Sequence, residues 1–130
     1  MNFSAIKKSV YFPAFLWLLL VSGLSVMPGA QLPKFNLFSI DKLAHAGVYG
    51  ILTWLLLWGM GRAQPNTPLR PAQVAGAILF ATGYGILMEF VQYAFIPGRF
   101  YEIDDMIANA VGSVAAWLGW KMMGVLKKTV

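Results

Sequence analysis

Long apolar stretches alternate with short polar joints along the whole chain. Continuous apolar residues occupy about 10–27, 43–60, 72–96 and 104–124. Each stretch is close to the roughly 20 residues that a helix needs to cross a hydrocarbon core of about 30 Å. None shows the strict alternation of a membrane β-barrel. The pattern predicts an all-α membrane protein, a bundle of four transmembrane helices that forms a single domain over residues 1–130.

Turn and cap residues stand at the ends of these stretches. Pro28-Gly29 is expected to end the first stretch and Pro97-Gly98 the third. Ser39 precedes the second stretch, where it is suited to be an N-cap. The first stretch also follows two lysines, as a signal peptide would. It is long for a signal core, however, and Pro28 occupies a position where a cleavage site needs a small residue, so we expect this helix to be retained.

Basic residues predict the orientation of the four helices. If all four span, the N-terminus, the middle loop and the C-terminus share one side, which carries Lys7, Lys8, Arg62, Arg70, Lys121, Lys127 and Lys128. The other side carries Lys34, Lys42 and Arg99. Cytoplasmic loops are enriched in lysine and arginine. We therefore expect a multi-pass membrane protein with both termini cytoplasmic.

Composition agrees with this class and excludes others. Apolar residues make up 58% of the chain and charged residues 12%, which is far from the balance of a soluble domain. The formal net charge is +5, but the basic residues flank apolar segments and do not form a stripe with interleaved aromatics. We expect membrane lipids as partners and no nucleic acid. Cysteine is absent, which rules out disulfides and thiolate metal ligands.

The acidic residues and the single histidine gather where the first and second and the third and fourth stretches are joined, or just inside these stretches. Residues three or four apart share one face of a helix, so the second, third and fourth stretches each carry one polar stripe at the same end. Ionisable groups inside a membrane span are costly to bury and usually functional. The predicted ligand-binding residues are Asp41, Lys42, His45, Glu89, Gln92, Arg99, Asp105 and Asn109.

The order and spacing of these residues resemble a known family. The fragments are Asp41-Lys42-x-x-His45, then Glu89-x-x-Gln92, then Arg99 followed by Asp105 and Asn109. Together they resemble the VanZ-like family of bacterial membrane proteins, over about residues 38–120. The resemblance implies a protein of the bacterial envelope and a link, through the founding member, to resistance against glycopeptide antibiotics such as teicoplanin. It implies no catalytic residue.

Several of these residues also have purely structural interpretations. Asp41 and Asp105 stand at expected helix starts, where a carboxylate can cap backbone amides, and Gln92 and Asn109 can link helices by hydrogen bonds. Glu89 is different, because it lies about 10 Å inside the outer end of its helix, too deep to cap it. It therefore needs a partner, and the candidates are Lys42, His45 and Arg99.

We favour a binding site on the outer side of the membrane. Arg99 and Lys42 would attract the anionic group of a lipid or of a lipid-linked cell-wall precursor. The group would be oriented by Glu89, Gln92 and Asn109. The aromatic side chains of Phe100 and Tyr101 would lie against the acyl or prenyl chain. This hypothesis requires neither a metal nor another cofactor.

Two other classes stay open, so the sequence does not decide whether the protein is an enzyme. In an intramembrane metal-dependent hydrolase, Asp41, His45 and Glu89 would be ligands, or Glu89 a general base, although one histidine is few for zinc. In an accessory or structural protein, the polar cluster would hold the bundle together. The small residues between Ala108 and Ala116 would then dock on a partner protein.

Overall fold

The computed structural model describes residues 10–27 and 40–128, the last four by their backbone alone. They form four helices, α2 (Phe12–Ser25), α3 (Ile40–Ala63), α4 (Pro71–Phe95) and α5 (Ile103–Lys128). The described residues contain no strand, which confirms the all-helical prediction. The expected Ser39 cap and Pro28-Gly29 stop lie outside these residues.

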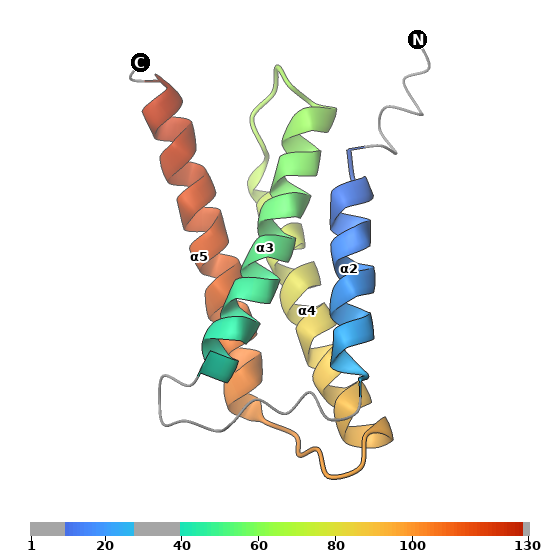
Figure 1. The fold of residues 1–130 in the computed structure, drawn as a ribbon. Helices are drawn as coiled ribbons and strands as arrows, with labels where there is room; N and C mark the ends of the chain where they lie inside the picture. Colours follow the sequence, from blue (N-terminus) through green and yellow to red (C-terminus); the bar gives the residue numbers. More distant parts are fainter. Residues whose placement is uncertain (1–9, 28–39, 129–130) are drawn as a thin grey trace.

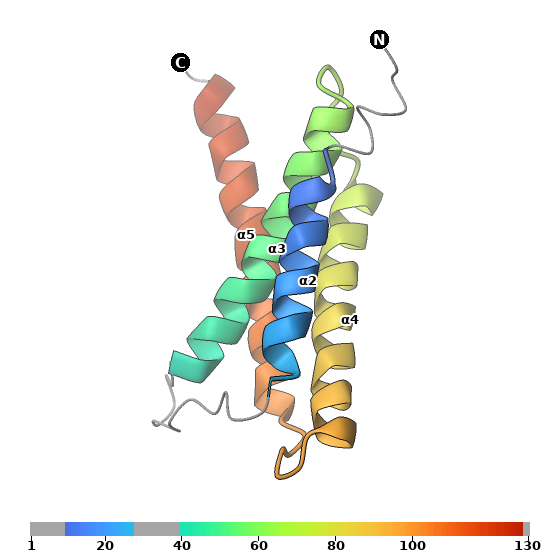
Figure 2. The same cartoon turned by 45° about the vertical axis from the view of Figure 1, so that its right-hand side comes forward.

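The helices run up and down side by side (Figures 1 and 2). The start of α2, the connection between α3 and α4 and the end of α5 lie at the upper end of Figure 1. The start of α3 and the connection between α4 and α5 lie at the lower end. Helices α3 and α5 meet near the lower end and diverge towards the upper end, as both views show.

Two helices, α3 and α4, are long and apolar enough to cross a membrane. Helix α3 begins three residues before the expected stretch and ends three residues after it. Helix α2 has 14 residues, fewer than the 18 of the apolar stretch, and forms a shorter apolar helix. Helix α5 includes Asp104, Asp105 and Lys121, which reduce its hydropathy. Four membrane spans therefore remain a prediction.

Glycines allow α3 and α5 to approach each other closely at their lower ends. These two helices form the most extensive helix pair of the bundle. A Cβ atom added to Gly112 would overlap the backbone of Ala46, including its carbonyl oxygen. A Cβ atom on Gly50 would lie 3.0 Å from the carbonyl oxygen of Gly112. Gly85 plays the same part for α4, because a Cβ atom there would overlap the side chain of Asn109. Small residues thus bring the three polar stripes together.

Helix α2 is attached to α3 and α4 by packing and by polar contacts. Val21 of α2 joins a core cluster with Tyr49, Leu52 and Ala81. The indole Nε1 of Trp17 donates a hydrogen bond of 2.9 Å to the carbonyl oxygen of Val48. Five residues later in α2, the hydroxyl group of Ser22 shares a short hydrogen bond with the hydroxyl group of Tyr84 in α4. Polar side chains therefore hold an otherwise apolar helix against the bundle.

The indole hydrogen bond gives a first testable prediction. We expect Trp17→Phe to lower the free energy of unfolding by about 0.5–1.5 kcal/mol, the usual scale for hydrogen bonds between membrane helices. Most of the aromatic packing survives this change, but the carbonyl of Val48 loses its donor. Denaturation with SDS, followed by circular dichroism, measures the effect. Phe15→Leu is the control, because Phe15 is 55% exposed and its truncation should change little.

Candidate functional site

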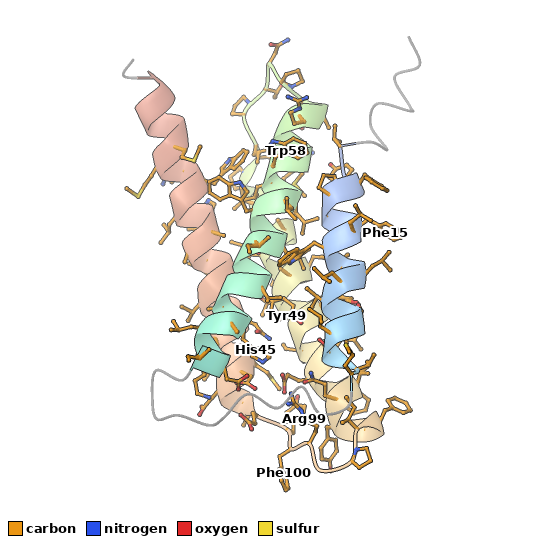
Figure 3. All side chains as sticks on the ribbon, viewed as in Figure 1. Phe15, His45, Tyr49, Trp58, Arg99 and Phe100 are labelled. Carbon is orange, nitrogen blue, oxygen red and sulfur yellow. The ribbon has the colours of Figure 1, made fainter. Side chains whose placement is uncertain are left out.

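The predicted polar residues gather at the lower end of the bundle. Figure 3 shows His45 and Arg99 there, with Tyr49 further up the same helix and Trp58 near the opposite end. Helical spacing places Asp41 and His45 on the face of α3 that meets α5 and α4. Their neighbours from those two helices are Glu89, Asp105 and Asn109. All eight residues named from the sequence lie at this end.

His45 is the centre of the arrangement. Its Nε2 atom lies 3.9 Å from Asp41 Oδ1, 3.9 Å from Glu89 Oε1 and 3.6 Å from Asp105 Oδ2. We call these four residues the His45 cluster. The three oxygen atoms come from three different helices, so the cluster exists only when α3, α4 and α5 are packed together.

The other ring nitrogen of His45 fixes the orientation of the imidazole. Nδ1 lies 3.1 Å from the side-chain Oδ1 of Asn109, which is fully buried. The amide nitrogen of Asn109 lies against Gly85 on the other side. Since the amide oxygen accepts, Nδ1 is the donor, and Nε2 of a neutral ring then presents its lone pair to the three carboxylates.

Lys42 balances part of this negative charge. Its ammonium nitrogen lies 3.6 Å from Asp105 Oδ1 and 3.7 Å from Asp104 Oδ2. The side chain of Asp105 is buried and that of Asp104 is 71% exposed. Lys42 therefore pairs with one carboxylate inside the bundle and with another at its surface.

Glu89 is the deepest acidic residue of the site. It is 2% exposed, and its closest ionic partner is His45, one of the three candidates that the sequence offered. The carboxylate makes no hydrogen bond to any other residue that the structure describes. Burying a carboxylate that accepts no hydrogen bond costs free energy. The stability of the buried Glu89 carboxylate therefore depends on positive charge near Nε2 of His45.

Arg99 belongs to a second polar group beside the His45 cluster. The Pro97-Gly98 turn, in which Gly98 has a φ of 80°, leads the chain from α4 to Arg99. The guanidinium donates a hydrogen bond of 3.0 Å to the side-chain oxygen of Gln92. Gln92 in turn donates one of 3.0 Å to the carbonyl oxygen of Ser25 in α2. Among the described residues Arg99 is thus held by Gln92, and not by an acidic residue as one sequence interpretation suggested.

A cavity of about 240 Å³ lies between these two polar groups and α2. One part of its wall is apolar and consists of Val21, Leu24, Ala44 and Val48. The polar part consists of Ser25, Asp41, His45, Tyr49, Gln92 and Arg99. The cavity therefore offers an amphiphile both a polar and an apolar surface.

The apolar wall differs from the sequence prediction. Phe100 is 74% exposed and does not line the cavity, and Tyr101 contacts Tyr93 and Met106. The wall is formed by Val21 and Leu24 of α2 and by Ala44 and Val48 of α3. These side chains were missed because the sequence pattern shows that a helix is apolar but not which of its faces meets a distant polar site.

Three of the clustered residues have the geometry of potential metal ligands. One ligand atom from each of Asp41, His45 and Asp105 lies within 4.8 Å of the others. The hydrolase alternative named Asp41, His45 and Glu89. The structure thus has Asp105 in the place of Glu89 in this group, although the sequence did not name Asp105 among the potential ligands.

A larger cavity of about 700 Å³ lies between α4 and α5 towards the upper end. Its wall includes Ile78, Trp117 and Trp120, and its one charged residue is Lys121. None of the eight predicted residues lines this cavity. We therefore place the candidate site at the lower end.

The described residues form a helical bundle with two membrane-capable helices and a buried polar cluster at one end, which are features of a small membrane protein. Within that class, the VanZ/LLP1 family model matches residues 2–124, and the chain belongs to this family. The match confirms the resemblance seen in the sequence and extends it to nearly the whole chain. Searches of curated proteins and of solved structures gave no match.

Proposed function

We propose that this VanZ-family membrane protein binds an anionic lipid, or a lipid-linked cell-wall precursor, in the cavity at the lower end. The observation that carries the proposal is the combination of Arg99 with an apolar wall in one cavity. A planar guanidinium suits a phosphate or carboxylate group. An acyl or prenyl chain would lie along Val21, Leu24 and Val48.

The charges around the cavity support a particular orientation of the head group. The anionic group belongs beside Arg99 and the amide of Gln92, on the side formed by α4. Asp41 and His45 lie on the other side and suit hydroxyl or amine groups of the same ligand. A phosphate that carries a sugar or an amino group would fit this arrangement better than a bare fatty acid.

Membrane orientation is part of the proposal. With four spans in the bacterial inner membrane, both termini and the connection between α3 and α4 would be cytoplasmic by the positive-inside rule. The cavity would then face the outer leaflet, where envelope precursors are assembled into the cell wall. A role in teicoplanin resistance would follow if the bound ligand belongs to the pathway that this antibiotic blocks.

Native mass spectrometry of gently purified protein tests the proposal. We expect the wild type to retain an anionic lipid and Arg99→Ala to lose it. Occupancy should fall about tenfold or more, because a charge-assisted hydrogen bond contributes about 1.5–3 kcal/mol. Ala44→Phe should have the same effect by filling the apolar side of the cavity while Arg99 stays in place. Circular dichroism establishes that each variant is folded.

Arg62→Ala is the matched control. Arg62 is an exposed arginine at the upper end, where it lies over the ring of Trp58. This variant should keep the bound lipid. Equal occupancy in the wild type and in folded Arg99→Ala and Ala44→Phe variants would contradict the proposal and favour an accessory role.

A further inference from the structure

Three carboxylates face one histidine nitrogen at separations that hydrogen bonds do not explain. Hydrogen bonds join heavy atoms at about 2.7–3.2 Å. The distances from His45 Nε2 to Asp41, Glu89 and Asp105 are 3.9, 3.9 and 3.6 Å. The atoms converge on a common space without touching one another. From this geometry we infer that the His45 cluster binds one divalent transition-metal ion.

The separations are close to those between ligands of one metal ion. Ligand atoms that lie about 2.0–2.2 Å from a tetrahedral zinc ion are about 3.3–3.6 Å apart. The Asp105 distance falls within this range and the other two lie slightly above it. The ligand atoms of Asp41, His45 and Asp105 all lie within 4.8 Å of one another. Glu89 lies outside this group, so its carboxylate has to move inwards to act as a fourth ligand.

Two buried carboxylates support a cation at this place. The Oδ1 atom of Asp105 has no hydrogen-bond partner among the described residues, and Glu89 is directed at the same nitrogen. Its side chain is 3% exposed and has no hydrogen-bond donor among the described residues. Lys42, the nearest ammonium group to the cluster, lies beside Asp105 and Asp104. A metal ion between Nε2 and the carboxylates would place a second positive charge beside Glu89, in addition to its contact with His45.

Asn109 gives His45 the surroundings of a metal ligand. Metal-bound histidines usually donate their second ring N–H to an oxygen, which fixes the tautomer and directs the free lone pair at the metal. Nδ1 of His45 lies 3.1 Å from Asn109 Oδ1, and the fully buried Asn109 of α5 contacts both α3 and α4. This contact leaves Nε2 available on the side of the three carboxylates.

One imidazole nitrogen and three carboxylate oxygens form a mixed donor set. Imidazole suits zinc and iron, and carboxylates suit manganese and magnesium. The set therefore favours Zn²⁺ or Mn²⁺ over Mg²⁺ and Ca²⁺, which prefer oxygen ligands alone. This inference rests on the four side chains of the His45 cluster, two of which, Asp41 and His45, also line the neighbouring cavity.

The single histidine of the chain makes a direct test possible. The full chain, purified with a tag that contains no histidine and stripped with EDTA, is titrated with Mn²⁺. Free Mn²⁺ is measured by continuous-wave EPR, and the bound ion by pulsed EPR. We expect one Mn²⁺ per chain, displaced by equimolar Zn²⁺, with nitrogen modulation from a coordinated imidazole. That modulation has one possible source, His45.

Variants separate this site from surface binding. His45→Gln should abolish the nitrogen modulation and weaken Mn²⁺ binding about 100-fold or more, beyond the 10–100-fold typical of second-shell changes. Glu89→Gln should weaken binding to a similar extent while the modulation stays at whatever occupancy remains. Asp104→Asn is the matched control, because Asp104 is exposed and faces Lys42. It should bind Mn²⁺ as the wild type does.

The wild type alone can overturn the inference, even if a variant fails to fold. Folded wild type that binds neither Mn²⁺ nor Zn²⁺ would show that the three carboxylates face His45 without a metal ion, and the inference would be wrong. Mn²⁺ bound without nitrogen modulation, or lost equally in Asp104→Asn, would place the ion on surface carboxylates. Lipid occupancy, measured separately by mass spectrometry, does not enter these readouts, so the two proposals fail independently.

Discussion

Gly112→Ala is expected to destabilise the bundle although alanine is the better helix former. A Cβ atom at this position would overlap the carbonyl group and the Cα atom of Ala46, which belong to the backbone of α3. Backbone atoms cannot rotate away as a side chain would, so α3 and α5 must separate. Overpacking costs about 1–3 kcal/mol. Alanine gains about 1 kcal/mol over glycine in a helix, which does not offset a forced helix displacement.

The same substitution should also weaken the candidate site. Ala46 follows His45 directly, and Gly112 lies about one turn after Asn109, so separation of the helices lengthens the contact between these two side chains. We expect a lower SDS midpoint by circular dichroism and reduced Mn²⁺ binding in the same preparation. Gly83→Ala is the control, because nothing lies within 4 Å of a Cβ atom there. If both variants are as stable as the wild type, the description of a close contact between α3 and α5 at Gly112 is wrong.

Lys42→Met is the second substitution with a large expected effect. It keeps the aliphatic stem of the side chain and removes the ammonium group 3.6 Å from the buried carboxylate of Asp105. Breaking a buried ion pair on one side costs about 3–5 kcal/mol. The side chain of Lys42 is 31% exposed, and solvent screening reduces this to about 1–3 kcal/mol. The free energy of unfolding is measured in EDTA, so that no metal ion contributes.

A double-mutant cycle identifies the partner of Lys42. Asp105→Asn removes the buried charge, so adding it to Lys42→Met should recover much of the lost stability. Asp104→Asn should not rescue Lys42→Met, because Asp104 is 71% exposed and surface pairs contribute little. Equal rescue by both asparagine variants would show that the general field of the acidic residues matters, and not the pair with Asp105.

Helix content and the position of the polar residues followed from local rules. Apolar stretches of about 20 residues and the proline–glycine stops predicted helices near the observed α3, α4 and α5. Spacings of three and four residues placed each polar stripe on one face, and the order of the segments placed all stripes at one end. These features depend on residues near each other in the chain, which is why a single sequence reveals them.

Partner choice inside the site did not follow from local rules. The sequence offered Lys42, His45 and Arg99 to Glu89, and the structure pairs Glu89 with His45. Lys42 lies nearly one turn before His45 on α3 and reaches Asp105 and Asp104 instead. Arg99 follows the Gly98 turn and meets Gln92. Which residues form pairs therefore depends on how far along its helix, and how deep in the packed bundle, each side chain lies.

The sequence by itself determined the class of this protein, its helices and the end of the bundle that carries the ionisable residues, because hydropathy and helical periodicity are local properties. Tertiary structure alone decided that Gly112 and Gly85 allow the helices to approach closely, that Val21 and Leu24 form the apolar wall, and that three carboxylates meet at one nitrogen of His45. These contacts join residues far apart in the chain. They are set by how side chains of different helices fill a shared space, which no local pattern contains.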